Sequence, residues 1–420
     1  MSNIFAERVE ALRGMMRGKG WDAVIVRGSD PHNSEYPSER WKQVQWLSGF
    51  TGEAGDMVVT LDHAGLWTDT RYFIQANAQL AGTGIELHKT RVPEQVLIPQ
   101  WLREVFAGQE QPVIALDGLC NTASSVEEIK DALDARAEVI SVPDMLEPLW
   151  SGRPEIPQTP VFEAGLGESR AEKIAWLRGE MRSHGCDCVL VTVLDEIAWL
   201  LNVRASDIDY NPFAISYLLV DTENVRWFVH DGEDIVIDGV TVLPYQEFET
   251  VLSTEAGCYD RIMIDPGSLN YHISNILRLN ALGIEEVDSP VQLRKAVNNA
   301  KEIEGARKAH FLDGLAMEKF LYWFEKSLAA RKRITEWDAA VRLGRLRCEI
   351  DGYRDDSFET ISAYGKGAAL PHYITPKTDA PVIEASGMYL CDSGGQFDFG
   401  TTDITRTVPM GDCSRLEMED

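Results

Sequence analysis

The residues whose types and spacing most clearly suggest a reactive site lie between Tyr389 and Thr407, a segment that contains Asp392 and Asp403. An apolar stretch leads to Asp392, a Gly-rich connection follows, and a second strand-like stretch begins at Asp403, a pattern that predicts a β-hairpin. If the turn lies near Phe397 and Asp398, the two aspartates are roughly opposite one another and their side chains share a face. Two carboxylates that close cannot both ionise without a cation.

Divalent metal ions would resolve this repulsion. Carboxylate oxygens suit hard or borderline ions such as Mn²⁺, and two ions that share a bridging carboxylate can hold a hydroxide at neutral pH. The alternative is that each aspartate only accepts backbone N–H groups at a turn, and this is our interpretation of Asp398. We therefore predict a metal site at Asp392 and Asp403.

This segment resembles a known metal-binding hairpin. The run from Asp392 to Thr407, DSGGQFDFGTTDITRT, is similar to the hairpin of the creatinase, prolidase and methionine aminopeptidase superfamily, in the form found in its long, three-domain aminopeptidase P branch. The resemblance implies two divalent metal ions, most simply Mn²⁺, with Asp392 bound to one ion and Asp403 bridging both.

The resemblance also gives a role to His372, which lies twenty positions before Asp392 between Pro371 and Tyr373. One histidine after a Gly/Ala loop carries little information by itself. The family places a substrate-facing, catalytic histidine in this His-Tyr context, where it would donate to or accept from the scissile peptide or the tetrahedral intermediate.

The resemblance extends over most of the chain. The stretch from Leu66 to Phe73 is similar to the first domain of the branch, and the stretch from Leu194 to Asp207 is similar to the second. It implies a homodimer and short peptide substrates with proline at the second position.

The family's metal site has five ligands, of which a histidine and two glutamates come after the hairpin. The sequence ends at Asp420, and Glu417 and Glu419 follow the hairpin too closely to be those ligands. We therefore expect a chain cut within its catalytic domain, and a 420-residue fragment that is inactive alone.

An internal repeat organises the rest of the chain. Residues 7–26 and 172–191 share ten of twenty aligned positions, and each copy reads as an amphipathic helix, a glycine and a buried strand. A proline-rich linker near residues 150–160 separates the copies. After residue 300 a long helix continues through Trp323, a second helix begins at a capping box at Thr335, and strands are expected at 358–362, 387–391 and 403–408.

The predicted fold class is α/β. Residues 1–150 and 160–299 form two tandem domains that resemble the creatinase N-terminal domain, and residues 300–420 form the first half of a pita-bread α/β catalytic domain.

The bulk properties restrict the class of partner and the compartment. Forty basic against 67 acidic side chains give a net charge of −27, which would repel nucleic acid and anionic lipid. Seven cysteines without a C-x-x-C motif, no signal-like N-terminus and no membrane-length apolar run favour the cytoplasm.

The leading hypothesis is a metal-dependent aminopeptidase that hydrolyses the N-terminal Xaa-Pro bond of short peptides through a hydroxide that bridges its metal ions. Two alternatives remain: a prolidase-like Xaa-Pro dipeptidase, and a non-catalytic peptidase-homology module that binds peptides or proteins.

Overall fold

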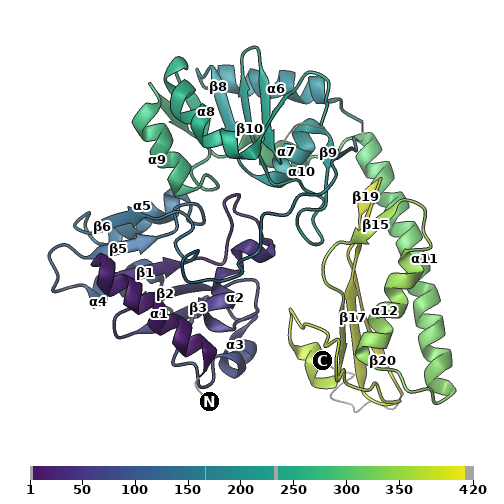
Figure 1. Cartoon of the computed structure of the whole chain (residues 1–420). Coiled ribbons are helices and arrows are strands. Elements are labelled where there is room, and N and C mark those ends of the chain that lie inside the picture. Colours follow the sequence, from purple (N-terminus) through teal and green to yellow (C-terminus); the bar gives the residue numbers. More distant parts are fainter. Residues whose placement is uncertain (1–2, 166, 231–234, 412–420) are drawn as a thin grey trace. The chain divides into compact units, whose positions relative to one another are not determined.

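The computed structural model describes residues 3–165, 167–230 and 235–411. The chain divides into two compact units (Figure 1). The first unit consists of residues 1–163, 169–208 and 213–296, and the second consists of residues 164–168, 209–212 and 297–420. Most residues of the first two predicted domains lie in the first unit, and residues 164–168, 209–212 and 297–299 of the second predicted domain lie in the second unit. The boundaries of the three predicted domains remain predictions.

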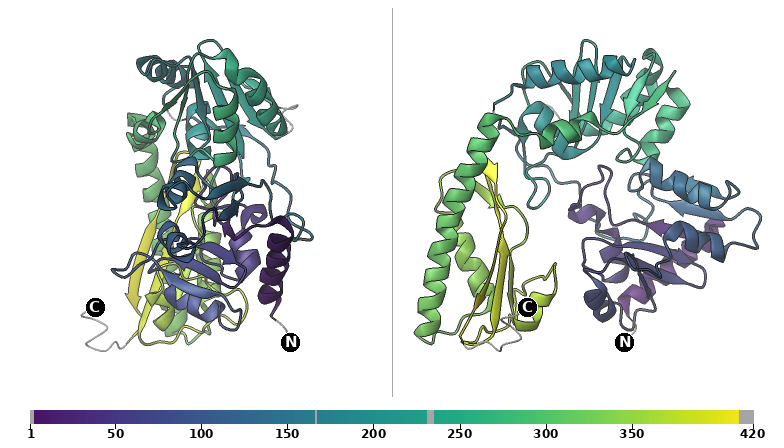
Figure 2. Two further views of the ribbon diagram at one scale, coloured as in Figure 1. Left: turned by 90° about the vertical axis from the view of Figure 1, so that its left-hand side faces the viewer. Right: turned by 180° about the vertical axis from the view of Figure 1, so that it is seen from behind.

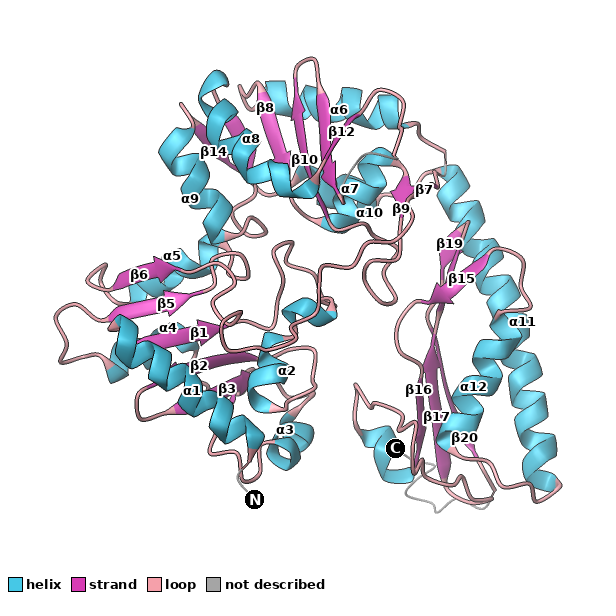
Figure 3. Cartoon of the chain, viewed as in Figure 1, coloured by secondary structure: helices cyan, strands magenta, loops and turns pink. Residues whose placement is uncertain are grey.

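The first repeat copy builds the first sheet around a helix and a strand with the predicted positions. Three apolar residues of helix α1, Val9, Leu12 and Met16, are buried, and Gly20 ends the helix with a φ of 71°, a value that favours glycine. Alternate residues of strand β1 enter different cores, with Val24 and Val26 on one side and Ala23 and Ile25 on the other. Helices therefore cover both faces of the sheet (Figure 3).

The strand order of this sheet is β4-β3-β2-β1-β5-β6. Strand β1 runs antiparallel to β2 and parallel to β5, and β4 pairs parallel to β3 at the edge. The elements are α1 (Ile4–Lys19), β1 (Ala23–Val26), α2 (Gln43–Ser48), β2 (Asp56–Thr60), β3 (Ala64–Thr68), α3 (Phe73–Gln79), β4 (Glu86–Lys89), α4 (Ile98–Val105), β5 (Val113–Leu116), α5 (Ala123–Ala132) and β6 (Glu138–Ser141).

The second repeat copy builds a sheet with the same pattern of pairing. Its order is β12-β11-β10-β8-β13-β14, with β8 antiparallel to β10 and parallel to β13. The elements are β7 (Phe162–Glu163), α6 (Arg170–Ser183), β8 (Cys188–Val191), α7 (Leu194–Leu201), β9 (Val203–Arg204), β10 (Ser216–Asp221), β11 (Val225–Val229), β12 (Thr241–Leu243), α8 (Phe248–Glu255), β13 (Ile262–Ile264), α9 (Tyr271–Asn280), β14 (Ile284–Glu286) and α10 (Pro290–Ala296).

The two sheets are joined at the starts of α5 and α9. The residues that cap these helices, Thr122 and Asn270, form an antiparallel bridge. The N–H of Ala123 donates to the carbonyl of Leu269 at 2.8 Å, and the N–H of Tyr271 donates to the carbonyl of Asn121 at 2.7 Å. Equivalent parts of the two copies therefore contact each other.

The second unit begins with the two predicted helices, α11 (Ala300–Ala329) and α12 (Glu336–Arg347). Thr335 caps α12 and forms a capping box with Asp338, as predicted. The views in Figures 1 and 2 show α11 as the longest helix, with the strands beside it.

The strands of the second unit form two three-stranded sheets among the described residues, with orders β16-β17-β20 and β15-β18-β19. The first predicted strand is displaced, since residues 358–360 precede β16, and three short strands were not predicted. The bounds are β15 (Tyr353–Asp356), β16 (Ile361–Tyr364), β17 (Met388–Ser393), β18 (Gly395–Phe397), β19 (Gly400–Thr401) and β20 (Ile404–Pro409).

No helix that the described residues form combines the length and the apolar character needed to span a bilayer.

Candidate metal centre

The predicted hairpin is present, with a register two residues from the predicted one. Strands β17 and β20 pair so that Asp392 lies opposite Thr405, and the turn falls at Asp398 and Phe399. Asp403 is therefore the diagonal neighbour of Asp392 and not its direct partner. Because side chains alternate with a period of two, a shift of two residues leaves both aspartates on the same face.

The two carboxylates interact across this face. Thr405 donates its hydroxyl to Oδ1 of Asp392 at 2.7 Å. Partial burial, and then the charge and hydrogen bonding of the Asp392 carboxylate, raise the pKa of Asp403. The charge of Asp392 thus disfavours ionisation of Asp403, in the direction that the sequence predicts, although burial has the larger effect.

Gly394 marks the point where the hairpin passes from one small sheet to the other. A Cβ atom at this position would lie 2.0 Å from the carbonyl oxygen of Thr402 and 2.1 Å from Oγ of Ser357. Only glycine allows this close approach, which brings the segment before Asp403 against the segment after Asp392.

A buried ion pair lies beneath the hairpin. The guanidinium of Arg347 donates to both carboxylate oxygens of Asp313, at 2.7 and 3.2 Å, and both side chains are fully buried. Arg347 also donates to Oγ of Ser393 at 3.0 Å, and the Thr402 hydroxyl donates to Asp313. Ser393 follows Asp392 and Thr402 precedes Asp403, so this network fixes the backbone beside each candidate ligand.

His310, on α11, lies near Asp403. Its positive form would lower the pKa of Asp403, which opposes the effect of burial. Its Nδ1 lies 2.9 Å from the carbonyl oxygen of Ala306, which suits an N–H donor there and leaves Nε2 for other partners. Gly400 brings β19 close to α11, because a Cβ there would meet Ala306 at 3.1 Å.

His372 lies half-buried in a turn whose neighbours are anchored to the core of the unit. The hydroxyl of Tyr373 donates to the buried Glu336 carboxylate at 2.7 Å, and the N–H of Ser362 donates to Thr375 at 2.9 Å. For Asp403, in contrast, the charged groups that shift the pKa are Asp392 and His310. The structure thus brings the two aspartates together, while the catalytic role of His372 stays a prediction.

The two aspartates have the donor chemistry of a site for a hard or borderline divalent ion. Both are carboxylates, and like charges at this range favour a cation. Within the described part of the chain, no third histidine, cysteine, aspartate or glutamate lies close enough to form a three-ligand group with them.

The sequence contains a signal for Asp313 and Arg347, which the sequence analysis did not predict as part of the site. Asp313 interrupts the buried apolar series of α11, between Ala309 and Met317, and Arg347 follows Leu343 by one helical turn. A charged residue at a core position of a helix is rarely buried without a partner. His310 has no such signal, because it lies on the exposed side of α11.

Comparison with known sequences decides the family. A model of the metallopeptidase family M24 matches residues 304–419, and two creatinase/prolidase N-terminal domain models match residues 8–149 and 152–302. A probable Xaa-Pro aminopeptidase P of Sordaria macrospora is 33% identical over 98% of this chain and 70% of its own length. The chain belongs to the Xaa-Pro aminopeptidase P family. The fold of a solved family member agrees, since the X-prolyl aminopeptidase of Caenorhabditis elegans superposes with a TM-score of 0.91 at 32% identity, over 98% of this chain and 71% of that one.

The match covers nearly all of this chain and part of each relative. A probable Xaa-Pro aminopeptidase P of Laccaria bicolor is 34% identical over 96% of this chain and 65% of its own length. The chain therefore spans about two thirds of the length of these family members. The predicted α/β fold class, with two creatinase N-terminal-like domains followed by a metallopeptidase domain of the pita-bread type, is confirmed. The solved structure of the Caenorhabditis elegans relative is described as that of a cytosolic enzyme with a di-nuclear active site.

Proposed function

We propose that this protein is a metal-dependent Xaa-Pro aminopeptidase whose metal ligands include Asp392 and Asp403. The observation that carries the proposal is the placement of both carboxylates on one face of the hairpin, within the region that matches the M24 metallopeptidase family. Two divalent ions, most simply Mn²⁺, suit these ligands, and the di-nuclear site of the Caenorhabditis elegans relative supports that number.

The metal ions would supply Lewis acidity toward the scissile carbonyl and lower the pKa of a bound water. Asp392 and Asp403 would both be ligands of these ions. The network of Asp313 and Arg347 holds the backbone beside both ligands, so the carboxylates are positioned before any ion binds. His372 would hydrogen-bond the scissile peptide, from a turn anchored by Tyr373.

The chemistry of proline explains the proposed substrate class. An Xaa-Pro bond is a tertiary amide without an N–H and with a ring-locked φ, so a peptidase that holds the N–H on the leaving side fails on it. A site that holds the free amino terminus and the pyrrolidine ring accepts it. We expect short peptides with proline at the second position as substrates.

Metal content tests the ligand assignment. The 420-residue chain is stripped with a chelator and titrated with MnCl₂ by isothermal titration calorimetry. Because two carboxylates provide few ligand atoms, we expect weak binding that Asp392→Asn and Asp403→Asn weaken further. Asp398→Asn is the matched control, because Asp398 lies at the turn of the same hairpin and pairs with Arg354. Equal Mn²⁺ affinity in all four proteins would refute the assignment.

Two peptides test the activity. A preparation that hydrolyses peptides should release arginine from Arg-Pro-Pro and not from Arg-Ala-Pro. Comparable rates on both would indicate a general aminopeptidase, and cleavage confined to dipeptides such as Ala-Pro would indicate a prolidase.

Assembly as a homodimer and residence in the cytoplasm belong to the same proposal. Light scattering on the active protein should give twice the mass of one chain, and a strictly monomeric active enzyme would contradict the dimer. Cell fractionation should place the protein in the cytosolic fraction.

A further inference from the structure

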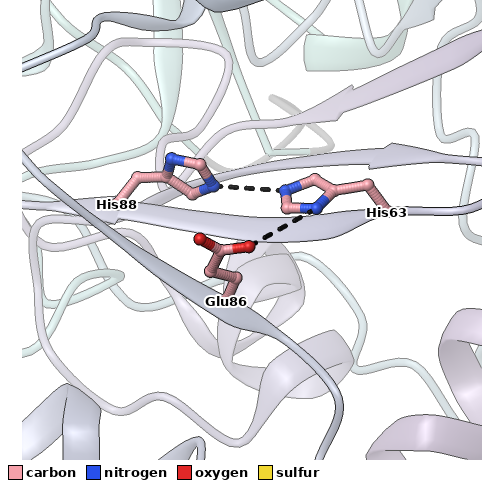
Figure 4. Close-up of side chains that lie close together, drawn as sticks. All are labelled: His63, Glu86 and His88. Carbon is pink, nitrogen blue, oxygen red and sulfur yellow. Dashed lines mark hydrogen bonds and ion pairs between the residues drawn. The ribbon is translucent and has the colours of Figure 1, made fainter.

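A second group of metal-ligand side chains lies in the first unit, on a different fold element from the hairpin. His63 lies in the turn between β2 and β3, and Glu86 and His88 lie on the edge strand β4. Strands β3 and β4 are parallel, with Gly65 opposite Glu86 and Trp67 opposite His88. Alternate positions share a face, so the three side chains point toward one another (Figure 4).

The ligand atoms of the three residues lie close enough together to reach one ion after small movements. Nε2 of His63 lies 3.1 Å from Nε2 of His88. The Glu86 carboxylate lies 3.8 Å from Nδ1, the other nitrogen of His63, which cannot bind the same ion as Nε2. One ligand atom from each residue lies within 4.8 Å of the others. Two nitrogens bound to one tetrahedral zinc ion, each about 2.0–2.1 Å away, are about 3.3–3.4 Å apart, so little movement would bring both imidazoles onto one ion.

Gly65 makes room for the two imidazoles. A Cβ atom at this position would lie 2.8 Å from Nε2 of His63, 2.7 Å from Cδ2 of His88 and 2.6 Å from the Trp67 ring. Any other residue would push the rings out of this arrangement.

Two tryptophans hold the imidazoles in place. The Trp67 ring stacks on His88 with a centroid distance of 3.8 Å and an angle of 6°, and the Trp101 ring lies 4.9 Å from His63. The indole N–H of Trp67 donates to the carbonyl of Val96 at 2.9 Å, which fixes that ring. Ligands whose orientation is set by packing lose little freedom when an ion binds.

The charge states of the ligands are also suitable. Partial burial lowers the pKa of both His63 and His88, which favours the neutral imidazole, the form that binds a metal ion. The Glu86 side chain is 68% exposed, which leaves one side of the cluster open to solvent for ion entry.

We propose that His63, Glu86 and His88 bind one divalent transition-metal ion of the zinc class. Two imidazoles and one carboxylate suit zinc and other borderline ions better than Mn²⁺ or Mg²⁺, which prefer oxygen ligands. The ion ties edge strand β4 to the turn between β2 and β3, so its role is to stabilise that edge of the sheet.

The test titrates ZnCl₂ into the untagged 420-residue chain carrying both Asp392→Asn and Asp403→Asn, because these changes remove the candidate ligands of the hairpin. We expect one equivalent of zinc by calorimetry and by elemental analysis after dialysis. His88→Phe keeps the ring stacked on Trp67 and removes the nitrogen, and Glu86→Gln removes the carboxylate from an exposed position. Each should weaken zinc binding at least about tenfold, the lower limit for disturbing a metal site.

His272→Gln is the matched control, because His272 also pairs with a glutamate, Glu249, at 3.2 Å, and has no second imidazole beside it. It should leave zinc affinity unchanged. Zinc should also raise the melting temperature of the parent protein and not that of His88→Phe. If zinc does not bind, or binds equally to the parent protein, His88→Phe and Glu86→Gln, the cluster is only a hydrogen-bonded histidine pair and the proposal is wrong. Neither result bears on the proposed peptidase function, whose ligands are absent from the tested background.

Discussion

Removing the charge of Asp313 should destabilise the hairpin that carries Asp392 and Asp403. The change Asp313→Asn keeps the shape of the side chain, so it creates no cavity. It leaves the fully buried guanidinium of Arg347 without its carboxylate partner. Nη1 of Arg347 already lacks a hydrogen-bond partner among the described residues.

The expected magnitude follows from the burial of the pair. Breaking a buried ion pair by removing one partner costs about 3–5 kcal/mol. The Asp356 carboxylate, 3.7 Å from Arg347, compensates in part, so we expect the lower end, about 3 kcal/mol, which is about a hundredfold in an equilibrium constant.

Hydrogen exchange measured by mass spectrometry gives the required resolution, because it reports local opening and not a single unfolding transition. Peptides that contain β17, β20 and the end of α12 should exchange about a hundredfold faster in Asp313→Asn. Peptides of the first unit should be unchanged and serve as an internal control. The weak Mn²⁺ affinity should also fall, because the network positions the backbone beside both ligands.

Asp398→Asn is the matched control for stability. It removes an aspartate from a second Asp–Arg pair of the same unit, with Arg354, in which the side chains are 43% and 55% exposed. An exposed pair contributes about 0–1 kcal/mol, so exchange should change little. If Asp313→Asn accelerates exchange by less than about tenfold, or by no more than Asp398→Asn does, the reasoning about burial is wrong.

Three further predictions concern pH, catalysis and capping. Burial raises the pKa of Glu196 to about 7, above its unfolded value of about 4.3. The folded state therefore binds this proton more tightly, and the contribution of Glu196 to stability should fall as pH rises from about 4 to about 7 and then level off. Glu196→Gln should remove part of this slope in melting temperature against pH, and an unchanged slope would contradict the assignment. In a preparation that hydrolyses Xaa-Pro peptides, His372→Ala should lower kcat by about 10²-fold with metal content unchanged. Asp403→Asn should abolish turnover. Loss of metal from His372→Ala would show that the substrate-binding role assigned to His372 is wrong. Thr335→Ala should destabilise the start of α12 by about 1 kcal/mol, seen as faster exchange in its first turn, while Thr335→Ser should not; equal exchange in both variants would refute the capping argument.

The elements of the repeat could be predicted because local periodicity and burial agree. Val9, Leu12 and Met16 recur at helical spacing, and the same residues are buried in the structure. The hairpin register was predicted less well, because the Gly-rich connection permits more than one turn position and the turn fell at Asp398 and Phe399.

Interactions between distant residues could not be read from the sequence in this way. Asp313 and Arg347 are 34 positions apart and meet only when α11 packs on α12. His63 and His88 are brought together by the pairing of β3 with β4, which no spacing rule predicts. Charged and polar residues at core positions are the signal that could have indicated the first of these pairs.

The paired contacts between α5 and α9 have a consequence for the origin of the first unit. The N–H of Ala123 donates to the carbonyl of Leu269, and the N–H of Tyr271 donates to the carbonyl of Asn121. Each repeat copy therefore donates one hydrogen bond and accepts the equivalent one, on either side of the bridge between Thr122 and Asn270. Such reciprocity is the property of a two-fold symmetric interface, in which one surface is complementary to itself. A single ancestral domain with this surface would form a symmetric dimer, and joining two copies in one chain makes that dimer permanent. Each copy is then free to diverge: the edge strand β4 of the first carries His88, whereas the corresponding edge strand β12 of the second, Thr241–Leu243, has no histidine.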